Sequence, residues 1–394
     1  MSILAVNVGS SSIKFGLYRI ANHTVDEAEM TGAIEGIEPS GQPRIHWSSK
    51  GQSRHNEDIL VHQDSDPFEA ALNTLKLLLQ KDYSHIALRA IAHRVVHGGT
   101  LFTSSTVVTS EVLTKLATLN SLAPLHQPHN LEGIRAFTEA FSNLKQVACF
   151  DTAFHRTLPA LETTFAIDRK LARMGVQRFG FHGLSYQYIT QTLKLVSPRS
   201  SGRTIMAHLG NGASLCATIH HESRATTMGF SAVDGLMMGT RCGALDPGVL
   251  LFLMEQGWGH DAIEKLLYKQ SGLLGVSGES ADMRTLSASS SESARFAIDL
   301  FTYRIVREMG ALTACIAGID VIAFSGGIGE HDAELRTRVC QSLAYLGVSI
   351  DTALNTRAVG DSVQSIHSTN SRVEVWVIPT DEGRVSAQEA LALL

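Results

Sequence analysis

The chain has 394 residues, of which 44% are hydrophobic and 18% are charged. This composition excludes a disordered, collagen-like or coiled-coil protein, and the length is enough for two or three domains with apolar cores. The net charge of −5 provides no basic excess for nucleic acid or for an anionic membrane surface. We therefore expect neither of these partners, and any bound anion must be held by a few placed cations and backbone amides.

The sequence predicts neither a membrane span nor a secretory signal. The most apolar stretch, residues 311–324, is interrupted by Asp320 and is shorter than the roughly 20 residues that a span requires. The N-terminus has no basic region and no small-residue cleavage site. The five cysteines are odd in number and far apart, which favours free thiols over disulfides or a zinc site. Together these features predict a cytoplasmic protein.

The chain opens with two short strands that are joined by a tight turn. Residues 3–8 form an apolar run, Gly9 and three serines follow, and residues 13–18 alternate between apolar and other side chains. Because a strand follows the turn, the segment differs from a Walker loop and from a Rossmann fingerprint. A similar unit recurs at residues 203–219, around Gly210 and Gly212. This repeat predicts a duplicated α/β architecture with two phosphate-binding turns, and two unrelated hairpins are the alternative.

Helices are expected between and after these strands. Asp66 and Pro67 have the pattern of a helix N-cap and first helical residue, and apolar side chains follow at helical spacing to residue 79. A second apolar stripe covers residues 301–316, and strands are expected at 321–324 and 373–378. Residues 379–382 would open a C-terminal helix. We place the domain boundary after Asp151, at the end of a strand-like run.

Three segments could bind phosphate groups. Residues 7–14 combine backbone N–H groups of a tight turn with hydroxyls and Lys14, and residues 208–212 and 326–329 are glycine-rich turns that follow strands. Ordinary turns explain any one of these segments. Three of them, each after a strand, favour a nucleotide phosphate ligand.

Several charged or polar side chains stand in apolar surroundings. Arg94 and Arg241 are flanked by small and apolar residues, Asp151 ends a strand, and His182 lies between Phe181 and a glycine. Buried charges need partners, so a structural Arg–Asp pair is the alternative for each. Two arginines, an aspartate and a histidine would suit phosphoryl transfer, in which catalysis consists mostly of positioning and charge neutralisation.

Two pairs of residues are candidate metal ligands. His126 and His129 resemble a transition-metal pair, but Pro128 between them argues against a helical face that would present both. Magnesium, held by Asn7 and Glu382 through water, is the expected metal, and manganese is an alternative.

Taken in order along the chain, these segments resemble the motifs of the acetate kinase family. The resemblance covers nearly the whole chain, and the joint pattern is specific although its parts are not. The residues that carry it are Asn7-Val-Gly-Ser-Ser-Ser-Ile-Lys14, His93-Arg-Val-Val-His-Gly-Gly99, Phe150-Asp-Thr-Ala-Phe-His155, Phe179-Gly-Phe-His-Gly183, His208-Leu-Gly-Asn-Gly212, Met238-Gly-Thr-Arg241 and Gly327-Ile-Gly-Glu330.

The resemblance implies an α/β fold of the actin-like, sugar-kinase-like superfamily, with two domains of duplicated ribonuclease-H-like topology and a cleft between them. The expected domains are residues 1–151, joined by a C-terminal helix at about 384–394, and residues 152–383, which would bind nucleotide and dimerise. The implied reaction is the reversible Mg²⁺-dependent transfer of the ATP γ-phosphoryl group to acetate, which gives acetyl phosphate and ADP. The resemblance also implies a homodimer.

The resemblance assigns a role to each matching position. Asp151, His182 and Arg241 would be catalytic, Asn7 and Glu382 would serve the metal, and Arg94 would hold the substrate carboxylate. A small acyl pocket would be lined by Val96, Leu125, Phe181 and Ala232. The nucleotide would contact Lys14, His208, Leu209, Gly210, Asn211, Gly212, Asp282, Met283, Arg284, Gly327, Ile328, Gly329, Glu330 and His331.

The family interpretation gives Asp151 an acid–base role, which the chemistry of acetate does not require. A carboxylic acid with an ordinary pKa is already ionised at pH 7 and needs no base to become a nucleophile. We therefore expect Asp151 chiefly to orient an arginine or the magnesium shell.

The chain departs from the family pattern at Leu184, Tyr186, Cys242, Ala244, Ala232 and His331. Alanine in place of the usual proline at 232 removes ring atoms from the acyl pocket, so we expect propionate to be accepted better than in a typical member. A kinase for propionate or another short carboxylate is therefore the first alternative function. An actin-like ATPase without carboxylate kinase activity is the second, although the apolar setting of Arg94 suits a small carboxylate better than a filament.

Overall fold

The computed structural model describes residues 1–38, 41–50, 55–61, 66–83, 86–124 and 126–394. Its contacts divide the chain into two compact units. Unit 1 comprises Met1–Ala153 and Asp381–Leu394, and unit 2 comprises Phe154–Thr380. The points at which the chain passes from one unit to the other lie close to the expected ones at Asp151 and residue 384. The roles of the two domains stay predictions. None of the helices in the described ranges is both long enough and apolar enough to cross a membrane.

Unit 1 is built on a mixed sheet with the strand order β5-β4-β3-β2-β1-β6-β8-β7. Strands β1, β2 and β3 pair antiparallel, whereas β6 pairs parallel with β1 and β8 pairs parallel with β6. The strands are β1 (Ser2–Val8), β2 (Ser12–Ala21), β3 (Thr24–Glu35), β4 (Arg44–Ser49), β5 (His55–Asp58), β6 (Leu88–Val95), β7 (Thr106–Val107) and β8 (Lys145–Phe150). The helices are α1 (Pro67–Asp82), α2 (Ser110–Ala117), η1 (Asn120–Leu122), α3 (Gln127–Ala140) and α15 (Glu382–Leu391).

Unit 2 contains a second mixed sheet with the strand order β11-β10-β9-β12-β14-β13. Its strands are β9 (Thr204–Leu209), β10 (Ala213–Ile219), β11 (Glu222–Thr226), β12 (Val321–Ser325), β13 (Gln364–Ser365) and β14 (Glu374–Val377). The helices before the last three strands are η2 (Ala153–Thr157), which begins at the boundary, α4 (Ala160–Thr163), α5 (Arg169–Arg173), α6 (Gly183–Val196), α7 (Pro247–Glu255), α8 (His260–Lys269), α9 (Gly272–Ser277), α10 (Met283–Ala288) and α11 (Glu292–Cys315). The remaining helices are α12 (Gly326–His331), α13 (Ala333–Ser342), η3 (Ala344–Leu346) and α14 (Thr352–Arg357).

The two sheets share one five-strand core. In unit 1 it is β3-β2-β1-β6-β8 and in unit 2 it is β11-β10-β9-β12-β14, each with three antiparallel strands followed by two parallel additions. This order is that of a ribonuclease-H-like sheet, so the predicted duplicated α/β fold is confirmed. The two strand–turn–strand units that the sequence revealed are β1–β2 and β9–β10.

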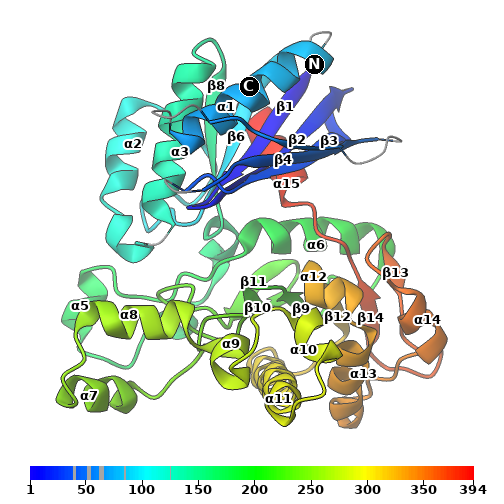
Figure 1. The fold of residues 1–394 in the computed structure, drawn as a ribbon. Coiled ribbons are helices and arrows are strands. Elements are labelled where there is room, and N and C mark those ends of the chain that lie inside the picture. The colour runs from blue at the N-terminus through cyan, green and yellow to red at the C-terminus, as the bar shows by residue number, and fades with distance from the viewer. Residues whose placement is uncertain (39–40, 51–54, 62–65, 84–85, 125) are drawn as a thin grey trace. The chain divides into compact units, whose positions relative to one another are not determined.

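Alternation along β1 separates the two faces of the first sheet. Leu4, Val6 and Val8 belong to an apolar cluster with side chains of α1 and with Phe137 of α3. Helix α15 contacts β1, β2, β3, β6 and β8, and Figure 1 shows this red helix against the blue strands of unit 1. The last helix of the chain therefore completes the fold of the first unit.

Tyr18 and two glycines set the close approach of α15 to β2. A Cβ atom at Gly16 would lie 2.7 Å from the Tyr18 ring, and one at Gly383 would lie 2.3 Å from the Tyr18 hydroxyl oxygen. The Tyr18 hydroxyl donates to Asp381 Oδ1 at 2.6 Å, and the same carboxylate oxygen caps α15 by accepting from the Arg384 N–H at 2.9 Å. These contacts place Glu382, in the first turn of α15, beside the sheet.

In unit 2, helices α6 and α11 lie on opposite faces of the sheet (Figure 1). Side chains of α6 pack with Met206, Cys216 and Val321 in one apolar cluster, whereas α11 contacts β9, β10 and β11. As in unit 1, helices cover both faces, and the ends of the strands carry the polar side chains described below.

One sequence expectation about the first unit was wrong. Pro128 does not prevent a helix, because it lies in the first turn of α3, where its missing N–H would have no intrahelical partner. His126 is the N-cap residue and His129 lies inside the helix. Among the residues that the structure describes, no group of three or more His, Cys, Asp or Glu side chains is placed to hold a metal ion.

Two buried histidines predict that the fold is less stable in acid. Burial lowers the pKa of His93 and of His155 to about 4, although hydrogen bonds to Gln146 and to the Phe181 carbonyl act in the opposite direction. In an unfolded chain a histidine titrates near pH 6.5, so between these values the unfolded state binds more protons. Each such histidine should therefore remove about 1.4 kcal/mol of stability per pH unit as pH falls from about 6.5 to 4.

We expect the melting temperature to be constant from pH 7 to 8 and to fall steadily below pH 6.5. Calorimetry or circular dichroism at a series of pH values measures this. Replacement of the partly exposed His129 by glutamine is the control and should leave the profile unchanged. A melting temperature that stays constant down to pH 5 would contradict the assignment of His93 and His155 as buried neutral groups.

Candidate functional site

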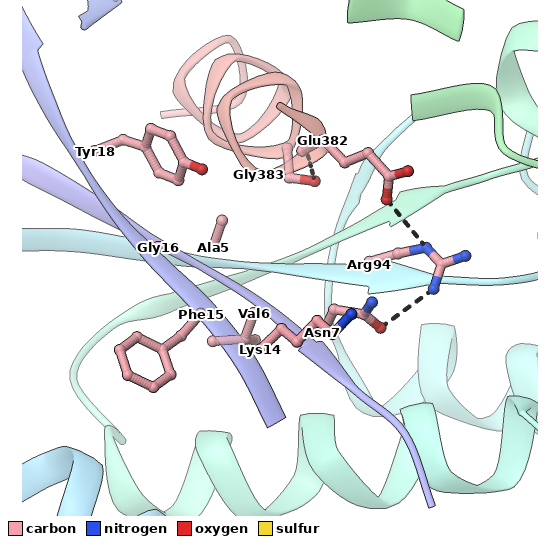
Figure 2. A pocket seen from close by; sticks show the side chains of 11 residues that line it. Ala5, Val6, Asn7, Lys14, Phe15, Gly16, Tyr18, Arg94, Glu382 and Gly383 are labelled. Atoms are coloured by element: carbon pink, nitrogen blue, oxygen red, sulfur yellow. Dashed lines mark hydrogen bonds and ion pairs between the residues drawn. The ribbon is translucent and has the colours of Figure 1, made fainter. Parts of the chain in front are cut away.

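A cavity of about 180 Å³ lies in unit 1, between β1, β2 and the start of α15. It is polar where Asn7, Lys14, Arg94 and Glu382 meet, and apolar toward Ala5, Val6 and Phe15. Figure 2 shows Arg94 between Asn7 and Glu382, with dashed contacts to both. The structure thus brings together, in one unit, four residues to which the sequence assigned roles in binding anions or metal.

Arg94 makes a bidentate ion pair with Asp151. Its Nε and Nη2 atoms donate to Asp151 Oδ1 and Oδ2 at 3.1 and 2.5 Å, and Nη1 donates to Asn7 Oδ1 at 3.3 Å. The Glu382 carboxylate lies 3.8 Å from Arg94 Nε. Arg94 comes from β6 and Asp151 follows β8, so the parallel pairing of these strands places the two side chains at the same edge of the sheet.

The surroundings keep Arg94 charged. Burial by itself would lower the pKa of its guanidinium, but the charges of Asp151 and Glu382 raise that pKa above its ordinary value. Asp151 is 1% exposed and Arg94 is 21% exposed, so the pair is largely desolvated. The structural Arg–Asp pair that the sequence left as an alternative is therefore present for these two residues, and Arg94 also lines the cavity.

The oxygen atoms of Asn7 and Glu382 suit a hard divalent cation. An amide oxygen and a carboxylate in one pocket are ligands that Mg²⁺ accepts, and Mg²⁺ typically takes one or two protein ligands and completes its shell with water and phosphate. Both residues also contact Arg94. The negative charge of Glu382 would therefore be neutralised jointly by the Arg94 guanidinium and by a bound cation.

In unit 2, His182 and Arg241 meet at Gly212. A Cβ atom at Gly212 would lie 2.8 Å from Arg241 Nη2 and 3.3 Å from His182 Nε2. Glycine therefore leaves room for both side chains beside the turn between β9 and β10. His182 has φ 58°, a left-handed conformation that costs a non-glycine residue about 1 kcal/mol, and it directly precedes α6.

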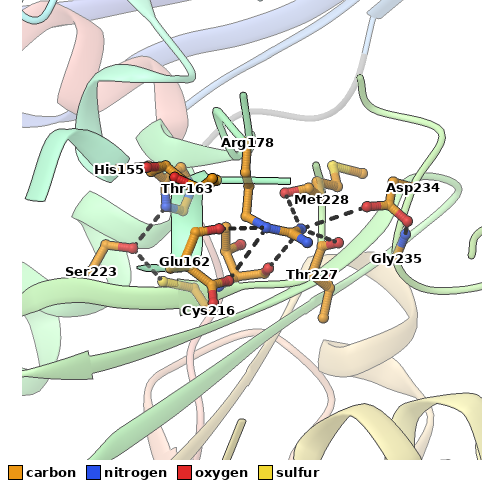
Figure 3. A network of polar contacts seen from close by, with 12 residues as sticks. His155, Glu162, Thr163, Arg178, Cys216, Ser223, Thr227, Met228, Asp234 and Gly235 are labelled. Carbon is orange, nitrogen blue, oxygen red and sulfur yellow. Dashed lines mark hydrogen bonds and ion pairs between the residues drawn. The ribbon is translucent and has the colours of Figure 1, made fainter. Parts of the chain in front are cut away.

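A network around Arg178 holds the loop that anchors Arg241. Arg178 Nη1 donates to the carbonyls of Thr226, Thr227 and Met228 at 3.1–3.2 Å and pairs with Asp234 at 3.5 Å (Figure 3). Its Nε lies 3.4 Å from Glu162 Oε1. In the same loop the Ala232 carbonyl accepts from Arg241 Nη1 at 2.6 Å. Arg178 was not among the expected site residues, although an apolar Phe179-Gly-Phe181 run follows it directly.

A larger cavity of about 710 Å³ lies between the β9–β10 turn, α10 and α12 of unit 2. Its lining includes eight positions that the resemblance assigned to the nucleotide: Gly210, Asn211, Asp282, Met283, Arg284, Gly327, Ile328 and His331. It also includes Ala281 and residues 332–334, which adjoin expected positions, and Ser287, which lies one helical turn after Arg284.

Other assigned residues lie outside this cavity lining. Leu209 is fully buried, and Glu330 accepts from the backbone N–H groups of Gly326 and Thr380 at 2.7 and 3.1 Å, so it braces the loop. Lys14 belongs to the cavity of unit 1. Within the acyl set, Val96 is buried in unit 1 and Phe181 is buried in unit 2, whereas Leu125 lies outside the described residues.

The departures from the family pattern have definite places. Leu184 and Tyr186 are buried in α6, and the Tyr186 hydroxyl contacts Ser214. Cys242 is half-buried, Ala244 is exposed, and the Ala244 N–H donates to the Gly235 carbonyl at 2.8 Å. His331 Nδ1 contacts the Gly327 carbonyl at 3.0 Å at the wall of the larger cavity.

Comparisons with known proteins agree with this arrangement. The model of the acetokinase family matches residues 2–388. The chain is 47% identical to an acetate kinase of Rhodopseudomonas palustris, over 99% of this chain and 98% of that protein. Among solved structures, an acetate kinase of Porphyromonas gingivalis superposes with a TM-score of 0.88 at 33% identity and covers 100% of this chain and 99% of that one. A propionate kinase of Francisella tularensis gives 0.89 at 36% identity and covers 98% of each chain. On its motifs, its duplicated sheets and these matches, the chain belongs to the acetokinase family, whose members are phosphotransferases with a carboxyl group as acceptor.

Proposed function

We propose that this protein transfers the γ-phosphoryl group of ATP to acetate and so forms acetyl phosphate and ADP, reversibly. The observation that carries the proposal is the meeting of Arg241 Nη2 and His182 Nε2 at the side of Gly212 where a Cβ atom would be. A glycine turn that leaves room for a guanidinium and an imidazole suits a phosphoryl group in transit.

The reaction joins two anions, so charge neutralisation is its main requirement. An acetate oxygen attacks the γ-phosphorus while the bond from that phosphorus to the β–γ bridging oxygen breaks. The acetate is already ionised and ADP leaves with the bridging oxygen as part of its phosphate, so no proton has to be transferred. Catalysis then depends on cations at both reactants, and Arg94 and Lys14 of unit 1 and Arg241 of unit 2 supply them.

In this proposal Arg94 binds the carboxylate of acetate through its Nη hydrogens, and Asp151 positions Arg94. The bidentate contact to Asp151 fixes the plane of the guanidinium, which supports an orienting role over proton transfer. Asn7 and Glu382 would hold Mg²⁺, or Mn²⁺ in its place, which when bound neutralises charge on the ATP phosphates. Lys14 would contact those phosphates.

The adenine and ribose of ATP are proposed to occupy the cavity of about 710 Å³ in unit 2. Its size is within the range of ligand pockets in proteins, which is about 300–1,000 Å³. Backbone groups of Gly210 and Gly327 allow close approach to the ligand, and the Arg284–Asp282 ion pair at 2.6 Å provides a polar edge.

The activity is tested by trapping the acyl phosphate with hydroxylamine during incubation with MgATP and acetate. We expect stoichiometric formation of acetohydroxamate and ADP. ADP formation without hydroxamate would instead support the alternative of an actin-like ATPase, which membership of the acetokinase family disfavours.

Propionate should be a good second substrate. Position 232 carries alanine, which leaves more room for an acyl methyl group than a proline ring, and one methylene in an apolar pocket changes the transition-state energy by about 1–3 kcal/mol. We therefore expect kcat/KM for propionate within about tenfold of that for acetate. Replacing Ala232 by proline should increase the preference for acetate, and a hundredfold preference for acetate in the unmodified protein would contradict the idea.

We propose in addition that the protein is a cytoplasmic homodimer. The five cysteines are free thiols, as suits a reducing compartment. Helix α7 exposes a row of large apolar side chains, among them Leu251, Phe252 and Met254 at 62, 56 and 55% exposure. A patch of this kind favours a protein partner. Sedimentation equilibrium should give twice the chain mass of 42.6 kDa, and Phe252→Asp should give monomers.

A further inference from the structure

The side chain of His182 is connected to a buried tyrosine through a serine. His182 Nδ1 lies 2.8 Å from Ser214 Oγ, and Ser214 Oγ lies 2.5 Å from the Tyr186 hydroxyl. Ser214 and Tyr186 are both 0% exposed, so neither hydroxyl reaches water. The three groups come from the N-cap of α6, from β10 and from the first turn of α6.

The direction of the hydrogen bonds follows from placing each hydroxyl proton. In the described part of the chain, the Tyr186 hydroxyl can donate its proton to Ser214 Oγ. The Ser214 hydroxyl can donate its own proton either to His182 Nδ1 or to the Tyr186 oxygen. If Ser214 donated to Tyr186, the buried Tyr186 proton would have no acceptor, which costs about 1–3 kcal/mol. Both protons are satisfied when Tyr186 donates to Ser214 and Ser214 donates to His182 Nδ1.

A neutral imidazole that accepts at Nδ1 carries its proton at Nε2. Nε2 is the atom of His182 that lies beside Gly212 and Arg241 Nη2. The chain of hydroxyls therefore aims an N–H donor at the position where the proposed function puts the phosphoryl group.

The neighbouring histidine has the same arrangement. Thr380 Oγ1 donates to Ser185 Oγ at 3.0 Å, and Ser185 Oγ lies 2.8 Å from His208 Nδ1. Ser185 is also 0% exposed. The rings of His182 and His208 are 4.4 Å apart, a distance at which two imidazolium charges would repel each other. Because Ser214 donates to Nδ1 of His182 and Ser185 donates to Nδ1 of His208, both imidazole rings are favoured in their neutral form.

We propose that Tyr186 and Ser214 are positioning residues that hold His182 in its neutral Nε2–H tautomer, as a hydrogen-bond donor to the transferring phosphoryl group. The inference rests on the proposed function for the role of His182, but the tautomer itself does not depend on the reaction. Position 186 is one of those at which this chain departs from the family pattern. The tyrosine that donates to Ser214 is therefore a feature of this chain and not of the family pattern.

The Tyr186 hydroxyl stays protonated and so remains a hydrogen-bond donor. Burial raises the pKa of its hydroxyl well above the ordinary value, although the contacts with Ser214 and with the backbone of His208 act in the opposite direction. The hydroxyl therefore keeps its proton throughout the pH range of catalysis.

The tautomer is tested in the unmodified protein by NMR with ¹⁵N-labelled histidine, with His182 assigned by its absence in His182→Gln. Long-range ¹H–¹⁵N spectra distinguish a protonated from an unprotonated ring nitrogen. We expect Nε2 protonated and Nδ1 unprotonated at pH 7.5. A proton on Nδ1 would overturn the proposal whether or not the protein makes acetyl phosphate.

Kinetics of Tyr186→Phe and Ser214→Ala give the second test. We expect kcat to fall about tenfold in Tyr186→Phe and somewhat more in Ser214→Ala, with the KM values for ATP and acetate changed less than about threefold. Because the contacts are in series, the double variant should be no slower than Ser214→Ala alone. Tyr303→Phe, in helix α11 of the same unit and 62% exposed, is the control and should retain full activity.

Unchanged kcat in folded Tyr186→Phe, or multiplicative losses in the double variant, would overturn the series arrangement. If Tyr186→Phe does not fold, the spectrum of the unmodified protein decides the question. Failure of the proposed function is recognised separately, because the unmodified protein would then form no hydroxamate.

Discussion

Arg241→Ala is expected to lower kcat by about 10³-fold or more while the protein stays folded, because one arginine at a transferring phosphoryl group contributes on the order of 10³–10⁵ in rate. Arg241 donates to the Ala232 carbonyl through Nη1, which leaves Nη2 beside Gly212 and His182. Removal of the side chain takes away charge that is needed most in the transition state, so kcat should fall more than KM rises.

The measurement is steady-state kinetics with MgATP and acetate, with circular dichroism and thermal melting as checks of folding. Arg224→Ala is the control, because Arg224 is a partly exposed arginine of the same unit whose ion pair is with Glu222 at 2.7 Å. An exposed pair of this kind contributes less than about 1 kcal/mol. Turnover like that of the unmodified protein in a folded Arg241→Ala variant would contradict its role.

Arg94→Ala is expected to impair both the fold and the binding of acetate. The sequence alone predicts a raised KM for the carboxylate. The structure adds that Asp151, which is 1% exposed, would lose its bidentate partner, and breaking a buried ion pair costs about 3–5 kcal/mol. Arg94→Lys keeps a charge but cannot reproduce two parallel hydrogen bonds, so we expect a folded protein with a KM for acetate raised at least tenfold.

A double variant separates the two effects. In Arg94→Met/Asp151→Leu both charges are absent, so the stability should return to within about 1–2 kcal/mol of the unmodified protein. The activity should not return, because acetate would find no guanidinium. Denaturant titrations and hydroxamate formation measure the two quantities. An unchanged KM for acetate in Arg94→Lys would count against carboxylate binding by Arg94.

The sequence predicted correctly those elements whose residue pattern depends only on neighbouring residues. The N-cap at Asp66 with Pro67, the two strand–turn–strand units and the apolar stripe of α11 each follow from backbone or side-chain preferences that neighbouring residues determine. The duplicated sheet could be inferred from the repeat, because two similar hairpins bury the same pattern of side chains in the same way. The expectation about Pro128 failed because the position of a proline within a helix decides whether it is tolerated, and Pro128 stands in the first turn of α3.

Contacts between residues distant in sequence could not be predicted in this way. Asp151 was expected to orient an arginine or the metal shell, but its partner Arg94 is determined by the parallel pairing of β6 and β8. The loop that holds Arg241 depends on Arg178, and the tautomer of His182 depends on Ser214, and in both cases the partner belongs to another element. The sequence by itself therefore determined the elements, the duplicated α/β class, the family and the residue types of the site. The tertiary structure decided which charges pair and which atoms face a ligand, because these depend on how strands and helices distant in sequence pack together.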